Sequence, residues 1–257
     1  MGVGGSLRHE LARLMTRRRF MLAGAVMLVA GVASMIVTRG SFISLPDIDR
    51  SIEYTGSMLW LTQIDQTGFF FLAWPLVIGG TLAEDLESGL AALLITRSGS
   101  RRRWFGAKIG AAYISSTLLL LLVAVFWLIV AAVLAPWDPT HAGGVVAWGS
   151  QLATSAPLVL GLVVVLILGL AAAATSAASM LFSALGAGRT VSQVGATVLY
   201  LLFMVSLPGP VNPGDRASML SCFAGWATPI ATVTYWAGVL GLTTTLTYAL
   251  LRVRENR

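Results

Sequence analysis

The sequence has little charge and few of the residues that carry chemistry. Charged residues make up 11% of its 257 positions, roughly half of what soluble globular domains carry, whereas hydrophobic residues make up 56%. The single cysteine, Cys222, excludes an intramolecular disulfide, and one thiol with two distant histidines makes no metal cluster. This composition predicts an all-α polytopic membrane protein.

Lysine is scarcer still, since Lys108 is the only one. A P-loop needs glycine directly before its lysine, and here Ala107 stands in that place, so the chain carries no nucleotide site of that kind. His9 and His141 fall on opposite sides of the predicted membrane, which leaves no Ser-His-Asp arrangement at one depth. We therefore expect neither an enzyme nor a cofactor in this chain.

Six apolar segments have about the length that a bilayer requires. They cover residues 20–38, 68–82, 104–135, 156–185, 194–207 and 231–251. Pro75 should kink the second, either as a tolerated packing irregularity or as a hinge. Small residues at 171–179 predict a tightly packed face on the fourth span. Residues 1–19 read as an amphipathic helix on the membrane surface, or as a basic tail that sets topology.

The cations place one side of these spans in the cytoplasm. On this topology 14 of the 17 lie inside, with both termini, which fits the positive-inside rule. The net charge of +6 therefore follows membrane topology, and we do not expect nucleic-acid binding. The outer segments are then 39–67, with a short interfacial helix at 52–64, then 136–154, and a partly re-entrant stretch at 208–229.

A charged island at 78–110 stands between two apolar runs. It holds three acids and five cations: Glu84, Asp85, Glu87, Arg97, Arg101, Arg102, Arg103 and Lys108. Thr81 and Glu84 have the spacing of a capping box, which predicts a short helix from Leu82 that Gly89 closes. On this helix Leu82, Ala83, Leu86 and Leu90 line one face, and the acids with Ser88 line the other.

At these residues the chain resembles the ABC-2 type transporter permeases. Glu84, Asp85, Glu87, Ser88 and Gly89 match the acidic-Ser-Gly element of that family, and Arg101 with Lys108 matches its basic element, although the turn at 98–100 lacks the frequent proline. The resemblance implies a coupling-helix loop at 81–103 that docks on a separate ATPase subunit, which would bind ATP and Mg²⁺. Arg101, Arg102, Arg103 and Lys108 would form a cytoplasmic basic anchor beside the third span.

The resemblance further implies an exporter in a bacterial plasma membrane, with a second permease subunit, identical or related, and an interfacial N-terminal helix. The predicted spans have no ionisable group at their centres, which favours a hydrophobic or amphipathic cargo such as a drug, lipid or peptide. The same observation argues against an ion-coupled secondary transporter. A non-transporting assembly or sensory protein, or a membrane-embedded enzyme, is the other alternative. The sequence leaves open the cargo, the direction of transport and whether the permease dimer is homo- or heteromeric.

Overall fold

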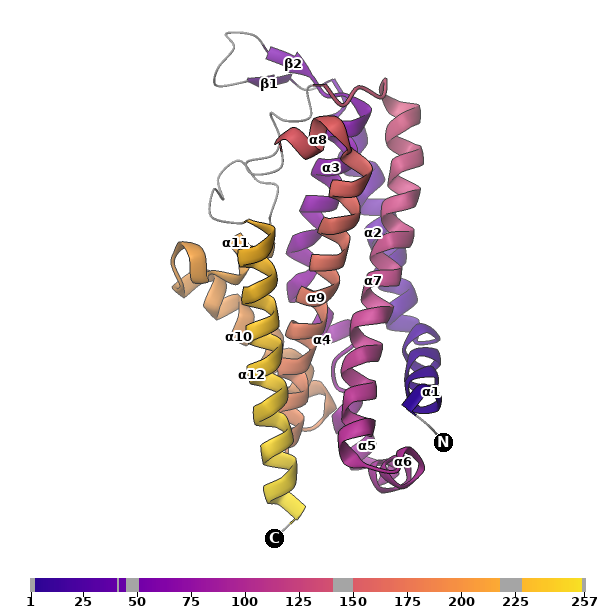
Figure 1. Ribbon diagram of the computed structural model, residues 1–257, viewed down its shortest axis with the longest axis vertical. Coiled ribbons are helices and arrows are strands. Elements are labelled where there is room, and N and C mark those ends of the chain that lie inside the picture. The colour runs from indigo at the N-terminus through magenta and orange to yellow at the C-terminus, as the bar shows by residue number, and fades with distance from the viewer. Residues whose placement is uncertain (1–2, 41, 45–50, 141–149, 218–227, 256–257) are drawn as a thin grey trace.

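The long helices run side by side in an elongated bundle (Figure 1). The computed structural model describes residues 3–255, except 41, 45–50, 141–149 and 218–227. Five long helices form the bundle: α2 (Arg18–Thr38), α7 (Arg101–Leu134), α9 (Pro157–Ala184), α10 (Arg189–Ser206) and α12 (Pro229–Glu255). Within the described residues, four helices are long and apolar enough to cross a membrane, namely α2, α7, α9 and α10.

The second predicted span is not one helix with a kink. It consists of the 3-10 helix η1 (Thr67–Leu72), the single turn α4 (Trp74–Val77) and α5 (Thr81–Glu87). Together with α3 (Gly56–Gln66), these segments form a bent pair, 56–72 and 74–87, that turns by 62° and counts as a fifth candidate span if it is taken as one. The chain turns before Pro75, which lies in the first turn of α4 where its missing N–H costs nothing.

The helix predicted at 52–64 lies inside the bundle and not on its surface. Its counterpart α3 is buried along most of its length, and the Trp60 indole donates to the Ala124 carbonyl of α7 at 2.8 Å. Asp65, assigned to an outer loop from the sequence, lies on α3 and is 8% exposed. The bent pair therefore carries a buried carboxylate above its bend, which the sequence analysis did not expect.

The sixth predicted span forms the continuous helix α12, which is 27 residues long. Its length suffices for a bilayer, but its mean hydropathy is too low for it to count among the candidate membrane spans. Threonines at 232, 234, 243, 244, 245 and 247 account for this. Most of their hydroxyls donate to backbone carbonyls in the preceding turn, for example Thr247 to Thr243 at 2.6 Å.

The fourth predicted span, α9, lies at the centre of the bundle. Every residue from Ala171 to Met180 is buried, which confirms the tightly packed small-residue face. Helices α7, α10, α12 and the bent pair pack around it. The small side chains allow this close approach: the Ser116 hydroxyl of α7 lies 3.3 Å from the Gly169 carbonyl, and Ser176 donates to the Trp74 carbonyl at 3.4 Å.

The end of the bundle opposite the termini is built from short elements. A two-stranded antiparallel ribbon pairs β1 (Phe42–Ser44) with β2 (Ser51–Glu53). In the part of the chain that the structure describes, all other regular elements are helices. Helix α8 (Ser150–Ser155) also lies at this end (Figure 1), and two more short helices, η3 (Gly209–Val211) and α11 (Pro213–Ala217), follow α10 in the chain. His141, Cys222 and residues 218–227 of the stretch predicted as re-entrant lie outside the described residues.

Both chain termini lie toward the same end of the bundle (Figure 1). That end also holds α1 (Val3–Met15), α5 and the short helix α6 (Leu90–Ser98). The long helix α7 extends there as well: its 34 residues span about 51 Å at 1.5 Å each, beyond the ~30 Å of a hydrocarbon core. One end of the fold therefore gathers the N-terminal helix and the charged island.

Candidate functional site

Three glycines shape the charged island. Gly80, Gly89 and Gly99 have φ angles of 75°, 72° and 77°, which residues other than glycine rarely adopt. Gly80 precedes α5, Gly89 separates α5 from α6, and Gly99 separates α6 from α7. Gly89 ends the first helix as predicted. The predicted capping box is wrong: α5 begins at Thr81, its N-cap is Gly80, and no side chain caps it. The Glu84 carboxylate instead reaches cations on other elements.

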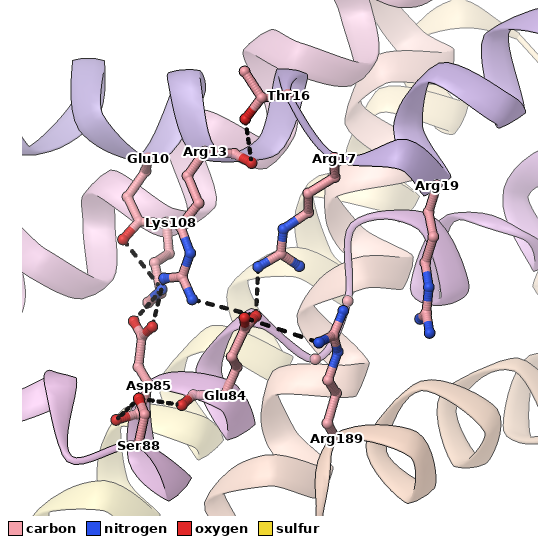
Figure 2. A network of polar contacts seen from close by, with 12 residues as sticks. Glu10, Arg13, Thr16, Arg17, Arg19, Glu84, Asp85, Ser88, Lys108 and Arg189 are labelled. Atoms are coloured by element: carbon pink, nitrogen blue, oxygen red, sulfur yellow. Dashed lines mark hydrogen bonds and ion pairs between the residues drawn. The ribbon is translucent and has the colours of Figure 1, made fainter.

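Asp85 lies at the centre of a buried group of four charges, which we call the Asp85 ion cluster (Figure 2). Asp85 Oδ1 accepts from Arg13 Nη1 of α1 at 2.5 Å, and Asp85 Oδ2 lies 2.6 Å from Lys108 Nζ of α7. Lys108 also donates to Glu10 Oε1 of α1 at 3.2 Å. The cluster, Glu10, Arg13, Asp85 and Lys108, joins α1, α5 and α7.

Burial makes these ion pairs interdependent. The side chains of Asp85 and Lys108 are 0% and 1% exposed, and that of Glu10 is 3% exposed. The two acids balance the two cations, which is the condition for charges to remain buried without a large desolvation penalty. Burial by itself lowers the pKa of Arg13, but the hydrogen bond and charge of Asp85 outweigh this and raise it. Arg13 therefore remains a cation in the cluster.

Glu84 extends the network toward α2 and α10. Its Oε2 accepts from Arg17 at 2.5 Å and lies 3.2 Å from Arg13, and its Oε1 lies 3.8 Å from Arg189 at the start of α10. Glu87 accepts a 3.1 Å hydrogen bond from the Arg189 backbone N–H. Helix α5 is therefore tied to α1, α7 and α10, and to the turn that precedes α2.

These contacts change the roles predicted for two residues. Asp85 was expected to contact a partner, but it is fully buried and its carboxylate is occupied by this chain's own cations. Lys108 was expected in a basic anchor, but it is 2% exposed and belongs to the Asp85 ion cluster. Both errors have one cause: the partners on α1 lie far away along the chain, Arg13 72 residues from Asp85 and Glu10 98 residues from Lys108.

The predicted N-terminal helix is present as α1, and its apolar side packs against the bundle: Leu14 is 3% exposed, and Leu7 and Leu11 pack against the core. The sequence analysis did not predict a role for Glu10, which is 2% exposed. A single acid among the cations of an amphipathic helix is the pattern that could have indicated a buried ion pair. Helix α1 therefore packs on α7 and covers the charged island.

An exposed edge remains on the charged island, which we call the α5–α6 edge. It consists of Glu87, Ser88, Gly89, Leu90 and Leu93. Leu90 and Leu93 are 43% and 49% exposed and lie on α6. The prediction that Leu90 belongs to the apolar face of the first short helix is wrong, because that helix ends at Glu87. Three of the residues predicted to contact a partner, Glu87, Ser88 and Gly89, are accessible here.

The four residues of the predicted basic anchor do not lie together: Lys108 belongs to the Asp85 ion cluster, whereas the three arginines stand apart from it. Arg102 and Arg103 are exposed at the first turn of α7, and the Arg102 guanidinium lies 5.9 Å from the Tyr248 ring centre on α12. Arg101 is half-buried and lies 3.5 Å from the Leu251 carbonyl. These arginines therefore stand where α7 meets the end of α12, away from the Asp85 ion cluster.

The fold places the protein in a broad class: it is a helical bundle, and four to five of the helices in the described residues have the length and apolarity of membrane spans. Comparisons with protein-family models, curated proteins and solved structures returned no match. The resemblance to ABC-2 permeases therefore rests on the charged island and the helix pattern. Among the described residues, no three His, Cys, Asp or Glu side chains come together as metal ligands.

Proposed function

We propose that the chain is the membrane-spanning subunit of an ABC-2 type exporter in a bacterial plasma membrane, driven by a separate ATPase. The bent pair and α12 would complete six spans, with both termini in the cytoplasm. The observation that carries the proposal is the α5–α6 edge: an accessible acidic and apolar surface at the end of the bundle where the termini also lie.

The surface has the composition of a contact site. Leu90 and Leu93 offer apolar area, and Glu87 with Ser88 adds polar groups beside them. Isolated exposed leucines need no explanation, but two on one short helix next to an acid suit a partner's groove. The ATPase would contact this edge, and a second permease subunit, identical or related, would complete the pathway.

The ion network supplies the transmission step of the proposal. A movement of the α5–α6 edge displaces Glu84 and Asp85, which are bound to cations on α1, α7 and α10. Because the pairs around Asp85 are buried, separating them is costly, so the attached helices would move with α5. Their movement would open a path for a hydrophobic or amphipathic cargo.

Two experiments test this function. In a Cys222→Ser background, Ser88→Cys should react with a membrane-impermeant maleimide only from the cytoplasmic side, and Glu53→Cys at the ribbon only from the outside. The chain produced with its ATPase should purify as a two-to-two complex, and Leu90→Glu/Leu93→Glu should lose the ATPase while remaining folded. External labelling of Ser88→Cys, or a chain that never copurifies with an ATPase, contradicts the proposal.

One observation favours a second candidate, an ion-coupled secondary transporter. Asp65 is buried on α3 within the bent pair, and a carboxylate on a broken span is a common feature of ion-coupling sites. Transport that persists without ATP, collapses with the ion gradient and is abolished by Asp65→Asn would establish this candidate in place of the exporter.

A further inference from the structure

A laterally open groove lies between α2, the bent pair and α10, and we call it the α2–α10 groove. Its volume is about 450 Å³, within the ~300–1,000 Å³ range of ligand pockets. Its walls are mainly apolar side chains, including Leu22 and Val26 of α2, Phe70 of η1, Leu76 of α4 and Val194 of α10. This apolar lining suits a hydrocarbon chain.

The polar end of the groove is held in place by hydrogen bonds. Gln193 is 3% exposed, and its Nε2 donates to the carbonyls of Leu76 and Gly79 at 3.1 and 2.8 Å. With the amide so fixed, its Oε1 accepts from Arg19 Nη1 at 2.8 Å. Gln193 therefore holds the Arg19 guanidinium at the mouth of the groove, beside Thr190.

Arg19 differs from Arg13, Arg17 and Arg189 in having no carboxylate within ion-pair distance among the described residues. Arg13, Arg17 and Arg189 each approach Glu84, as Figure 2 shows, whereas Arg19 points away from that network toward Gln193. Among the described residues, no carboxylate lies within ion-pair distance of Arg19, and none lines the groove. A guanidinium with donors left over at the end of an apolar groove is complementary to an anionic headgroup.

The level of Arg19 in the fold indicates where that headgroup would come from. Arg19 is the second residue of α2, at the end where the proposed topology places the cytoplasm, and Val26 lies about 10 Å further along the helix. An inner-leaflet lipid would thus meet Arg19 at headgroup level and the apolar walls at acyl-chain level. The positive end of a zwitterionic headgroup would find no acid there.

We propose that the α2–α10 groove binds one anionic phospholipid of the cytoplasmic leaflet, with its phosphate on Arg19 and one acyl chain against Val26 and the bent pair. The inference uses the membrane placement of α2 and α10 from the proposed function, and it needs no ATPase. A second groove, between α7 and α12, also has an arginine, but there Arg102 lies over the Tyr248 ring.

The test is native mass spectrometry of the purified full chain, titrated with phosphatidylglycerol and with phosphatidylcholine. Phosphatidylglycerol should bind preferentially, and Arg19→Gln should weaken it about tenfold, the effect of losing one charge-assisted contact. Arg18→Gln is the matched control: it removes the same charge one residue away, from an exposed side chain that does not line the groove.

A second pair of variants tests the acyl-chain position. Val26→Trp fills the groove from an exposed position and should weaken phosphatidylglycerol, whereas Val29→Trp, also exposed on α2 but outside the groove, should not. Equal losses in Arg19→Gln and Arg18→Gln, or unchanged binding to Val26→Trp, would overturn the proposal. So would spontaneous disulfide-linked dimers of Val26→Cys in the Cys222→Ser background, because a second copy would then fill the groove.

Discussion

Neutralising Asp85 offers the most direct test of the ion cluster. Asp85→Asn keeps the side-chain size and removes a charge that contacts Arg13 at 2.5 Å and Lys108 at 2.6 Å. Each cation retains one acid, because Lys108 still has Glu10 and Arg13 still has Glu84, both at 3.2 Å. We therefore expect a loss near the lower end for a broken buried pair, about 3 kcal/mol.

The double variant separates an ion cluster from ordinary packing. Lys108→Met alone should cost about 3–5 kcal/mol, since it leaves Glu10 buried without its cation. Each single variant removes the 2.6 Å pair between Asp85 and Lys108, so the loss of that pair is counted in both, whereas Asp85→Asn/Lys108→Met loses it only once. The double variant should therefore be more stable than the sum of the single losses predicts, by roughly 1–3 kcal/mol of coupling.

The assay is thermal unfolding of the purified protein in detergent, followed by tryptophan fluorescence. Trp104 is a local reporter, because its ring centre lies 5.4 Å from Lys108 Nζ. A 3 kcal/mol loss corresponds to a Tm roughly 6–12 °C lower. Arg18→Gln, the exposed control, should change stability by less than about 0.5 kcal/mol. The claim that these residues form a coupled ion cluster fails if the losses of the two single variants simply add in the double variant. It also fails if Asp85→Asn is as stable as Arg18→Gln.

Three further predictions concern other parts of the fold. Gly31→Ala would place a Cβ 2.2 Å from the Trp127 ring and should destabilise α2–α7 packing by about 1–3 kcal/mol in the same melt, whereas Gly238→Ala, with open space at its Cβ, should not. Leu93→Glu alone should weaken ATPase copurification while leaving Tm within a few degrees, since its side chain is half exposed. Arg17→Gln should lower Tm less in high salt than in low salt, because its pair with Glu84 is partly exposed and screened, and an equal loss at both salt levels would contradict this.

The sequence predicts the long helices well where an apolar run is unbroken. Residues 20–38, 104–135 and 156–185 each form one helix within a few residues of the expected ends. The second span could not be placed in this way, because Gly68, Pro75, Gly79 and Gly80 interrupt its apolar run and three short elements result. Hydropathy measures apolar length and carries no information on where a backbone turns.

The charged island illustrates a different limit. The sequence predicts α5 and its glycine stop, because both depend on neighbours in the chain. It does not predict that Asp85 faces inward, because its partner Arg13 lies 72 residues away. An acid on a short helix reads as solvated unless the folded chain brings a cation to it, and the helix periodicity that assigned Asp85 to the outer face could not show α1 above it.

The arrangement of α5 also indicates which elements would follow it if a partner pushed on the α5–α6 edge. Its covalent link to α4 passes through Gly79 and Gly80, where the helix is interrupted and glycine permits a change of backbone direction. Its links to α1 and α7 are buried ion pairs, which are costly to separate. On the proposed function, a push on Glu87 and Leu90 would therefore turn the chain at Gly80 and carry α1 and α7 along. Under conditions where it is folded, the Asp85→Asn/Lys108→Met variant should then still bind the ATPase and hydrolyse ATP, yet export poorly, because the edge and its partner would move without the long helix α7.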